Sequence, residues 1–345
     1  MNFYFKKHIL ILILFLIIGI SATTFFIYFF LKKENKDYVI TKDSMCLKDN
    51  EIANYDIKIR ENYYGDVVVI IEQDNKKRTI NIDNIRTSYH PIELHRCGIY
   101  LIKEFNVDYK KAKFSPGFNW TLWKYDYSGE SKKLLIIAEK IGDSEPNNYF
   151  STDFRIDPNE RFLVLQKGYF GREDYTLVIK DLKTLQDIFI LPILEIEKKN
   201  PDIMGNVSFE GGGWSQDGRY FWANTHYGAT TLGFIRIDTE NWQVDLFKAP
   251  EGVLGGDVFN VNTGYITVHP NTPWIGISEQ EKIEKEKRRK QGIGTELYIH
   301  NLINGERQFV ASTDEPLWWF KPQWLSDAEL QYELPDGERK VFRIN

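Results

Sequence analysis

Short runs of apolar and aromatic residues, separated by turn residues, extend along most of the chain. The runs are rich in Val, Ile, Leu, Tyr and Phe and are bounded by Gly, Asp, Asn or Pro, which is typical of β-strands joined by tight turns. A content of 15% aromatic residues also favours strands, because rings fit a pleated, half-buried surface. The clearest runs are 66–73, 98–105, 120–127, 161–166, 175–182, 231–238, 296–302 and 340–344. The sequence therefore predicts an all-β domain over residues 51–345.

A recurring phrase predicts how these strands are grouped. An apolar residue or Trp is followed by a polar turn, then by Arg, an aromatic residue and a strand. The phrase occurs at 154–165 (FRIDPNERFLVL) and 213–223 (GWSQDGRYFWA), with a weaker form at 322–334 (PQWLSDAELQYEL). Each full copy leads into a further strand that ends in an acidic residue and a turn. We interpret the unit as a four-stranded antiparallel sheet, which needs neighbours stacked radially on both faces.

The segment Trp214–Tyr220 resembles the repeat of TolB-type and WD-repeat-like β-propellers. The resemblance implies a propeller whose sheets are its blades, and roughly 45–50 residues per blade gives about six. Two copies depart from the pattern: Asn159–Glu160 replaces Asp-Gly, and Ala328 replaces Gly. The run 339–344 could share a blade with Tyr55–Arg60 and close the ring. The alternative fold is a pair of β-sandwiches or an irregular β domain.

Near the N-terminus, residues 9–31 contain no charged residue and no Pro over 23 positions. A helix of that length spans a bilayer core of about 30 Å, so we expect a transmembrane helix after a short tail, residues 1–8, and before a polar linker, residues 32–50. A membrane partner is thus predicted through residues 9–31. The alternative is a cleaved signal peptide, with Lys6 and Lys7 as its basic start and Gly19–Ala22 as its cleavage region.

Lysines flank the apolar run on both sides, so the positive-inside rule does not decide its orientation. A short tail before the run is typical of a signal anchor that leaves the N-terminus inside. The two cysteines, Cys46 and Cys97, could form a disulfide in an oxidising compartment, or could be two unrelated thiols. We therefore expect a single-pass membrane protein with an extracytoplasmic C-terminal domain.

One segment breaks the β pattern. Residues 279–291 (EQEKIEKEKRRKQ) are highly charged and favour a helix, but have almost no apolar face. We interpret them as a charged insertion that forms an exposed helix. The alternative is a basic contact, through Lys287, Arg288, Arg289 and Lys290, with an acidic surface or lipid headgroups.

Charge and motifs exclude several classes of function. The chain carries a net charge of −5, and the basic N-terminal residues 1–36 leave a net charge of −9 on the rest. An acidic domain is a poor ligand for nucleic acid, which is bound through clustered Lys and Arg. The sequence has no HExxH, GxSxG or phosphate-binding loop pattern, so no catalytic residue, cofactor or metal site is predicted.

Clustered aromatic residues are the best candidates for a binding surface, because they offer a large contact area at a modest entropic cost. The alternative for the same residues is packing between blades. The candidates are Trp222, His226, Tyr227, Trp318, Trp319 and Trp324. The expected function is a membrane-tethered extracytoplasmic propeller that binds or scaffolds a protein or glycan partner. The alternative function is an envelope enzyme, a glycan-acting hydrolase or lyase, with its site in the propeller cleft.

Overall fold

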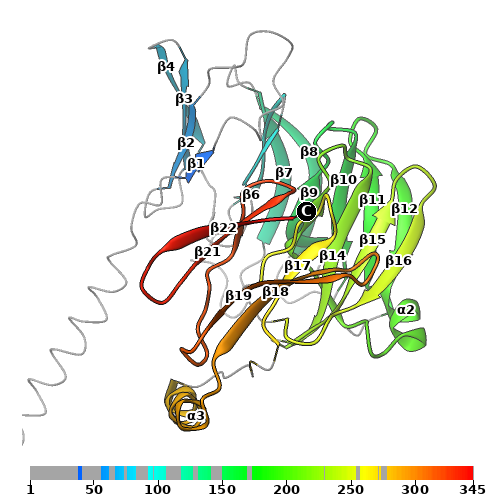
Figure 1. Ribbon diagram of the computed structural model, residues 1–345. Coiled ribbons are helices and arrows are strands. Elements are labelled where there is room, and N and C mark those ends of the chain that lie inside the picture. Colours follow the sequence, from blue (N-terminus) through cyan, green and yellow to red (C-terminus); the bar gives the residue numbers. More distant parts are fainter. Residues whose placement is uncertain are drawn as a thin grey trace, which may run out of the picture. The chain divides into compact units, whose positions relative to one another are not determined.

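The fold is seen in a computed structural model (Figure 1). It describes residues 38–40, 56–61, 67–73, 76–82, 92–95, 97–105, 118–126, 131–140, 150–168, 173–228, 230–253, 257–270, 272 and 278–344. The chain divides into two compact units, one of residues 1–44 and 49–89 and one of residues 45–48 and 90–345.

The first unit contains one antiparallel sheet in the order β1-β2-β3-β4. Its strands are β1 (Tyr38–Ile40), β2 (Asp56–Glu61), β3 (Val67–Gln73) and β4 (Lys76–Ile82). In β4 the buried Ile80 and Ile82 alternate with the exposed Thr79 and Asn81, as expected for a strand that packs through one face. β1 lies within the stretch predicted to be a linker, and it pairs with β2.

The second unit contains five antiparallel sheets, in each of which consecutive strands are neighbours. The first sheet consists of β5 (Ile92–His95), β6 (Gly98–Phe105), β7 (Phe118–Tyr125) and β8 (Ser131–Lys140). The next two are β9 (Phe150–Ile156), β10 (Phe162–Lys167), β11 (Thr176–Asp181) and β12 (Asp187–Pro192), then β13 (Asn206–Trp214), β14 (Tyr220–Tyr227), β15 (Thr230–Asp238) and β16 (Gln243–Lys248).

The last two sheets have three strands each. They are β17 (Tyr265–Val268), β18 (Thr295–Asn301) and β19 (Arg307–Thr313), then β20 (Gln323–Trp324), β21 (Glu329–Glu333) and β22 (Arg339–Arg343). In the sheet of β17, a β-bridge between Phe259 and Ile266 adds a short first strand. The sheet of β22 has no such addition among the described residues.

Consecutive sheets of the second unit pack face to face in chain order. One apolar cluster joins the first two sheets, a second joins the next pair, and two more continue to the end of the chain. Strands in the middle of a sheet are therefore buried on both faces: the four central residues of β10 and of β11 are buried. This is why these strands have continuous apolar runs instead of an alternating pattern. The fold is that of a β-propeller, as predicted.

Two helices interrupt the strands in the described part of the chain. α3 (Ser278–Gln291) coincides with the predicted charged insertion, and its ion pairs within the helix include Arg288–Glu284 at 3.0 Å. α2 (Ile193–Lys199) is a single short helix after Pro192 and was not expected. Its Ile193 is buried, so α2 is held by the core.

The recurring phrase forms the turn between the first and second strands of a sheet. In the phrase at 213–223, Gly218 has φ 71°, and Asp217 accepts hydrogen bonds from the Ser215 hydroxyl at 2.6 Å and the Arg219 N–H at 2.9 Å. In the copy at 154–165, Glu160 takes the left-handed position with φ 54°. That conformation costs a residue with a Cβ about 1 kcal/mol or more.

Contacts from the preceding sheet hold Glu160 in this conformation. Its carboxylate accepts hydrogen bonds from the Cys97 N–H at 2.9 Å, the Tyr100 hydroxyl at 2.6 Å and the Lys124 ammonium at 3.1 Å. Burial raises the pKa of Glu160, but these three hydrogen bonds outweigh burial and leave the pKa below its usual value. The departure from Gly is thus stabilised by contacts between two sheets.

In the weaker copy of the phrase, at 322–334, Ala328 replaces Gly for a different reason. Trp324 pairs with Leu330, whereas in the complete phrase Trp214 pairs with Phe221, so the turn at 325–328 is one residue shorter. None of its residues has a positive φ. A shorter turn needs no glycine.

Equivalent turns are linked from sheet to sheet, and we call this series the turn ladder. The Asn159 amide donates to the Asp217 carbonyl at 3.0 Å, the Gln216 N–H to the Asn262 side chain at 2.7 Å, and the Asn262 amide to Asp327 at 2.7 Å. With the contacts of Glu160, the turn ladder connects all five sheets of the second unit. We call this end of the sheets the turn end.

Two further predictions concern a transmembrane helix at residues 9–31 and the closure of the ring by residues 339–344. Residues 9–31 lie outside the described residues, and within the described part no helix is long and apolar enough to cross a membrane. The suggested blade shared by 339–344 and Tyr55–Arg60 is not found: β2 lies in the sheet of β1, β3 and β4, and β22 lies in the sheet of β20 and β21. β1 pairs with Ile57, Lys58 and Ile59 of β2, and β3 pairs with the whole length of β2 on its other edge.

A buried carboxylate in the first turn of the turn ladder predicts a measurable effect on stability. Asp157 is fully buried and accepts hydrogen bonds from the backbone N–H groups of Arg161 and Phe162 and from the Arg161 guanidinium. Substitution Asp157→Ala leaves those donors without partners and should lower the free energy of unfolding by about 3 kcal/mol, measured by denaturant titration of tryptophan fluorescence.

The matched control for this change is Asp202→Ala, at an exposed position, which should change stability by less than about 0.5 kcal/mol. Equal effects of the two substitutions would contradict a structural role for Asp157.

Candidate functional site

The end of the sheets opposite the turn ladder carries the longer connections of the second unit. α2 connects two sheets there, α3 lies between the second and third strands of its sheet, and residues 314–322 connect β19 to β20 (Figure 1). Loops on a rigid scaffold are common places for binding residues. We call this end the loop end.

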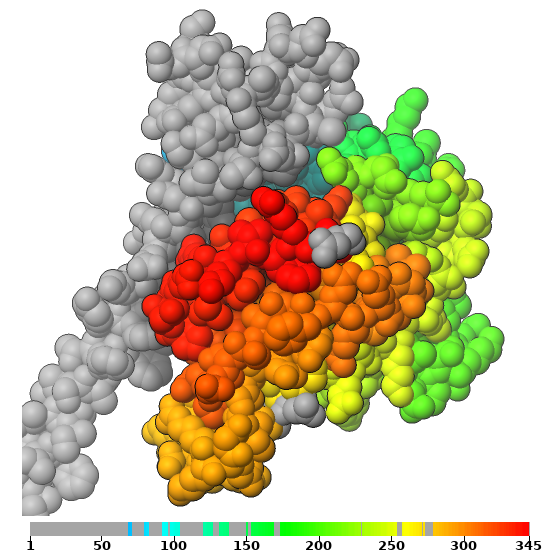
Figure 2. Space-filling view, viewed as in Figure 1, coloured from blue at the N-terminus to red at the C-terminus, as the bar shows by residue number. Residues whose placement is uncertain are grey.

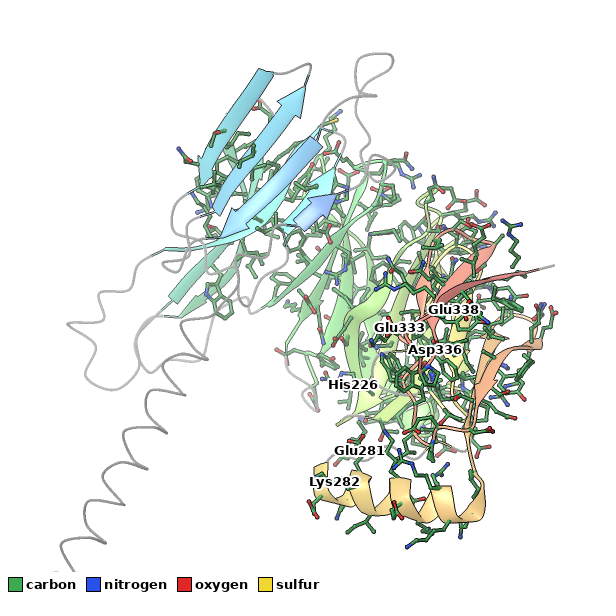
Figure 3. The ribbon with its side chains drawn as sticks, turned by 60° about the vertical axis from the view of Figure 1, so that its left-hand side comes forward. His226, Glu281, Lys282, Glu333, Asp336 and Glu338 are labelled. Carbon is green, nitrogen blue, oxygen red and sulfur yellow. The ribbon has the colours of Figure 1, made fainter. Side chains whose placement is uncertain are left out.

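Tyr227 is the most exposed large hydrophobic residue in the described part of the chain. It ends β14 at the loop end, and its side chain is 72% exposed. Beside it, His226 Nδ1 lies 2.9 Å from the Gly228 carbonyl, and its Nε2 lies 3.4 Å from the Asn206 amide. Figure 3 shows His226 on the side of the unit that carries Glu281 and Lys282 of α3. The turn fixes His226 and leaves the Tyr227 ring free to contact a partner.

Trp318 and Trp319 lie in the connection 314–322. The Trp318 indole donates to the Glu333 carbonyl at 2.9 Å, and its backbone N–H donates to Thr295 at 3.0 Å. Leu317 and Lys321 on either side have φ values of 54° and 46°. Left-handed backbone at residues other than glycine is unfavourable and persists only where the surroundings hold it. This connection therefore presents its aromatic residues in a defined conformation.

Trp319 covers a buried pair of titratable residues. Its ring stacks on His269 with centroids 5.2 Å apart. The side chains of His269 and Asp257 are both buried, and His269 Nδ1 lies 3.0 Å from an Asp257 carboxylate oxygen, although not in the geometry of a hydrogen bond. Asp257 also accepts a hydrogen bond from the Thr267 hydroxyl at 2.8 Å. Sequence analysis assigned His269 no role, because Asp257 and Trp319 lie 12 and 50 residues away from it along the chain.

Trp222 and Trp324 lie between sheets and not on the surface. Trp222 is 1% exposed and packs against Phe247 and Phe259 with ring centroids 5.4 and 4.9 Å apart. The half-buried Trp324 donates its indole N–H to the Val258 carbonyl at 3.2 Å. Trp222 therefore packs between two sheets, which was the alternative to a role in a binding surface. A partner could reach its ring only if the sheets separated. Of the predicted set, Tyr227 and His226 therefore lie at the loop end on the third sheet of the second unit, and Trp318 and Trp319 lie at the same end in the connection from β19 to β20.

A second group of polar residues lies on the first strands of three sheets, where β9 is in contact with both β5 and β13. Arg155 on β9 lies 3.6 Å from Glu93 on β5 and 3.9 Å from Asp153. The Arg155 guanidinium also donates to the Phe209 carbonyl at 3.1 Å. The Glu93 carboxylate accepts a hydrogen bond from the Ile156 N–H at 2.7 Å. We call Glu93, His95, Asp153, Arg155 and Glu210 the inner-strand group.

Charge in this group changes the pKa of Asp153. Burial raises the pKa of Asp153; Arg155 lowers it, and the charges of Glu210 and Glu93 raise it further, so that it lies above its usual value. The group has more carboxylates than cations, and a carboxyl with a raised pKa can act as a proton donor. Sequence analysis missed the group because its members are about 60 residues apart. No set of described side chains could hold a metal ion.

The remaining predicted features are the cysteines and the charged insertion. Cys97 is exposed and lies directly before β6, whereas Cys46 lies outside the described residues, so the disulfide stays a prediction. α3 is tied to the loop end through Glu315, which pairs with Lys285 at 3.4 Å and Arg289 at 2.7 Å. These pairs occupy two of its cations and leave others, such as Lys287 and Lys290, at the surface.

No protein-family profile and no curated protein matches this sequence. Solved structures of similar fold include TolB from Acinetobacter baumannii, with 12% identity over 85% of this chain and 64% of that chain, and a TM-score of 0.39. The β-propeller domain of the Trilobed protease from Pyrococcus furiosus has 14% identity over 90% and 85%, with a TM-score of 0.41. The β-propeller domain of Cps50 (Swd1) from Myceliophteria thermophila has 13% identity over 89% and 99%, with a TM-score of 0.39.

This chain therefore covers less than two thirds of the TolB chain. At these identities the similarity concerns the fold alone.

Proposed function

We propose that the chain is a membrane-tethered extracytoplasmic propeller that binds a protein or glycan partner at its loop end. The observation that carries the proposal is the difference between the two ends of the sheets. At the turn end, side chains of the turn ladder are used in hydrogen bonds between sheets. At the loop end, Tyr227 is 72% exposed on a fixed hairpin, beside long connections.

The aromatic and polar side chains at the loop end are suited to binding a protein or glycan partner. A Tyr ring provides a large apolar surface with a polar tip and loses little conformational entropy on binding. His226 and Trp319 add polar and aromatic atoms on the same end. Such a surface can bind a peptide or stack on a sugar ring, and in both cases Tyr227 is the expected anchor.

Site-specific photocrosslinking tests this proposal. A benzophenone amino acid in place of Tyr227 should give a discrete crosslinked product in illuminated cells. The same amino acid in place of Lys183, which is exposed at the turn end, should not. If protease degrades the crosslinked molecule, the partner is a protein; if the crosslinked molecule resists protease, the partner is a glycan. Equal products from both positions, or no product from position 227, would contradict a partner at the loop end.

The membrane part of the proposal rests on residues 9–31, whose 23 uncharged residues match the bilayer core. Protease added to intact cells or spheroplasts should digest residues 40–345, because the domain would lie outside the membrane. A cytoplasmic domain should be digested in the same way only after lysis. Protection in intact cells together with digestion after lysis would reverse the proposed topology.

The second candidate function is a glycan-acting hydrolase or lyase, and the inner-strand group favours it. Glycosidases use one carboxyl with a raised pKa as an acid and a second, ionised carboxylate. Asp153 has the raised pKa, and Glu93 lies beside the same guanidinium nitrogen of Arg155. These residues lie on first strands and not at the loop end, so the two functions can be tested separately.

The substitution Asp153→Asn should abolish any release of reducing sugar from cell-wall glycan by the purified chain. It should not lower stability, because an ionised carboxylate with a raised pKa is unfavourable in the folded state. The matched control is Asp202→Asn. Unchanged glycan cleavage in Asp153→Asn, or no cleavage by the unmodified chain, would exclude this function.

A further inference from the structure

β22 differs in its neighbours from the equivalent strands of the other sheets. β20 and β21 are joined by the shortened turn of the recurring phrase, in which the Leu325 N–H donates to the Glu329 carbonyl as the Ser215 N–H does to Tyr220. β22 is therefore the third strand of its sheet, equivalent to β11, β15 and β18. Each of those three lies between two strands, whereas β22 has β21 as its neighbour among the described residues.

β22 is also less buried than the equivalent strands of the other sheets. The central residues of β11 are all buried, and β18 alternates between buried and half-buried residues. In β22, four of five residues are exposed and Phe342 is half-buried. Residues of β21 and β22, in red, form part of the surface in Figure 2. Among the described residues, no strand occupies the position of a fourth strand beside β22.

The backbone hydrogen bonds show which groups point to the open side. The Leu334 N–H donates to the Glu338 carbonyl at 2.8 Å, and the Ile344 N–H donates to the Ala328 carbonyl at 2.9 Å. In an antiparallel sheet, hydrogen-bonded and non-hydrogen-bonded residue pairs alternate along the strands. The even-numbered residues of β22 are therefore the ones that form backbone hydrogen bonds with β21. The N–H and C=O groups of Arg339, Val341 and Arg343 thus point away from β21 and are available to another strand.

The side chains of these three residues share one face. Val341 is 47% exposed, and the side chains of Arg339 and Arg343 are 67% and 78% exposed. On β21, Glu333 lies 3.6 Å from Arg339, and Glu329 lies 2.9 Å from Arg343. Figure 3 labels Glu333, Asp336 and Glu338 of this hairpin. Acidic residues on β21 are thus followed by basic residues on β22, and each guanidinium has donors left for a second carboxylate.

We propose that the open edge of β22 binds an extended acidic segment of a partner protein as a fourth strand. Acidic residues of the segment lie opposite Arg339 and Arg343, and an apolar residue lies opposite Val341. Addition of a strand to a sheet edge uses backbone hydrogen bonds for affinity and alternate side chains for specificity. Opposite charges across a strand pair are favourable and like charges are not, so a basic segment is rejected.

This proposal deepens the proposed binding function by naming a partner chemistry, but it concerns a sheet edge and not the loop end. The photocrosslinking at Tyr227 and the experiment below can therefore fail independently.

The experiment measures binding of fluorescent peptides to the full chain in detergent by fluorescence anisotropy. A peptide with the core Glu-Thr-Ile-Thr-Glu places its two acids and its Ile opposite Arg343, Arg339 and Val341. It should bind at least tenfold more tightly than Lys-Thr-Ile-Thr-Lys. N-methylation of the Ile amide, which faces β22, should weaken binding at least tenfold, whereas N-methylation of the following Thr amide should not.

Variants of the chain complete the test. The double substitution Arg339→Glu and Arg343→Glu should weaken binding of the acidic peptide at least tenfold. The matched control, Lys287→Glu with Lys290→Glu on the exposed side of α3, should leave it unchanged. Because the peptide comparison uses the unmodified chain, it does not depend on the folding of a variant. No binding of the acidic peptide, equal binding of the basic peptide, or equal effects of the two N-methyl groups would overturn the proposal.

Discussion

The need to cover both faces of the central sheets of the second unit determines most of its structure. Leu163, Val164 and Leu165 of β10 are consecutive and all fully buried, so β10 requires an apolar neighbour on each side. The apolar clusters that join consecutive sheets provide these neighbours. Because the faces are used for packing, binding functions are left to the ends of the strands, the first strands and the open edges.

These remaining surfaces differ in what they can do. The turn end uses its polar side chains to hold sheets together, as the Asn159 and Asn262 amides do. The loop end leaves Tyr227 exposed, and the edge of β22 leaves backbone groups and two guanidinium groups available. The two proposed binding surfaces consist of different residues on different sheets, so each can be altered by substitution without changing the residues of the other.

The sequence predicts elements well and contacts poorly. The run 98–105 is β6 to the residue, and the charged segment 279–291 is α3, because strand and helix patterns are local. Burial of Trp222 depends on Phe247 and Phe259, and the inner-strand group depends on residues of three sheets. The open edge of β22 was missed for a similar reason: nothing in residues 339–344 shows which strand, if any, lies beside them.

Glu160 makes neighbouring sheets depend on one another. Where Gly218 adopts a left-handed backbone by itself, Glu160 does so with hydrogen bonds from Cys97, Tyr100 and Lys124 of the preceding sheet. A chain divided between residues 126 and 150 would leave that backbone conformation without its support. The blades of this propeller are therefore not interchangeable modules: their order along the chain is part of what makes each of them fold.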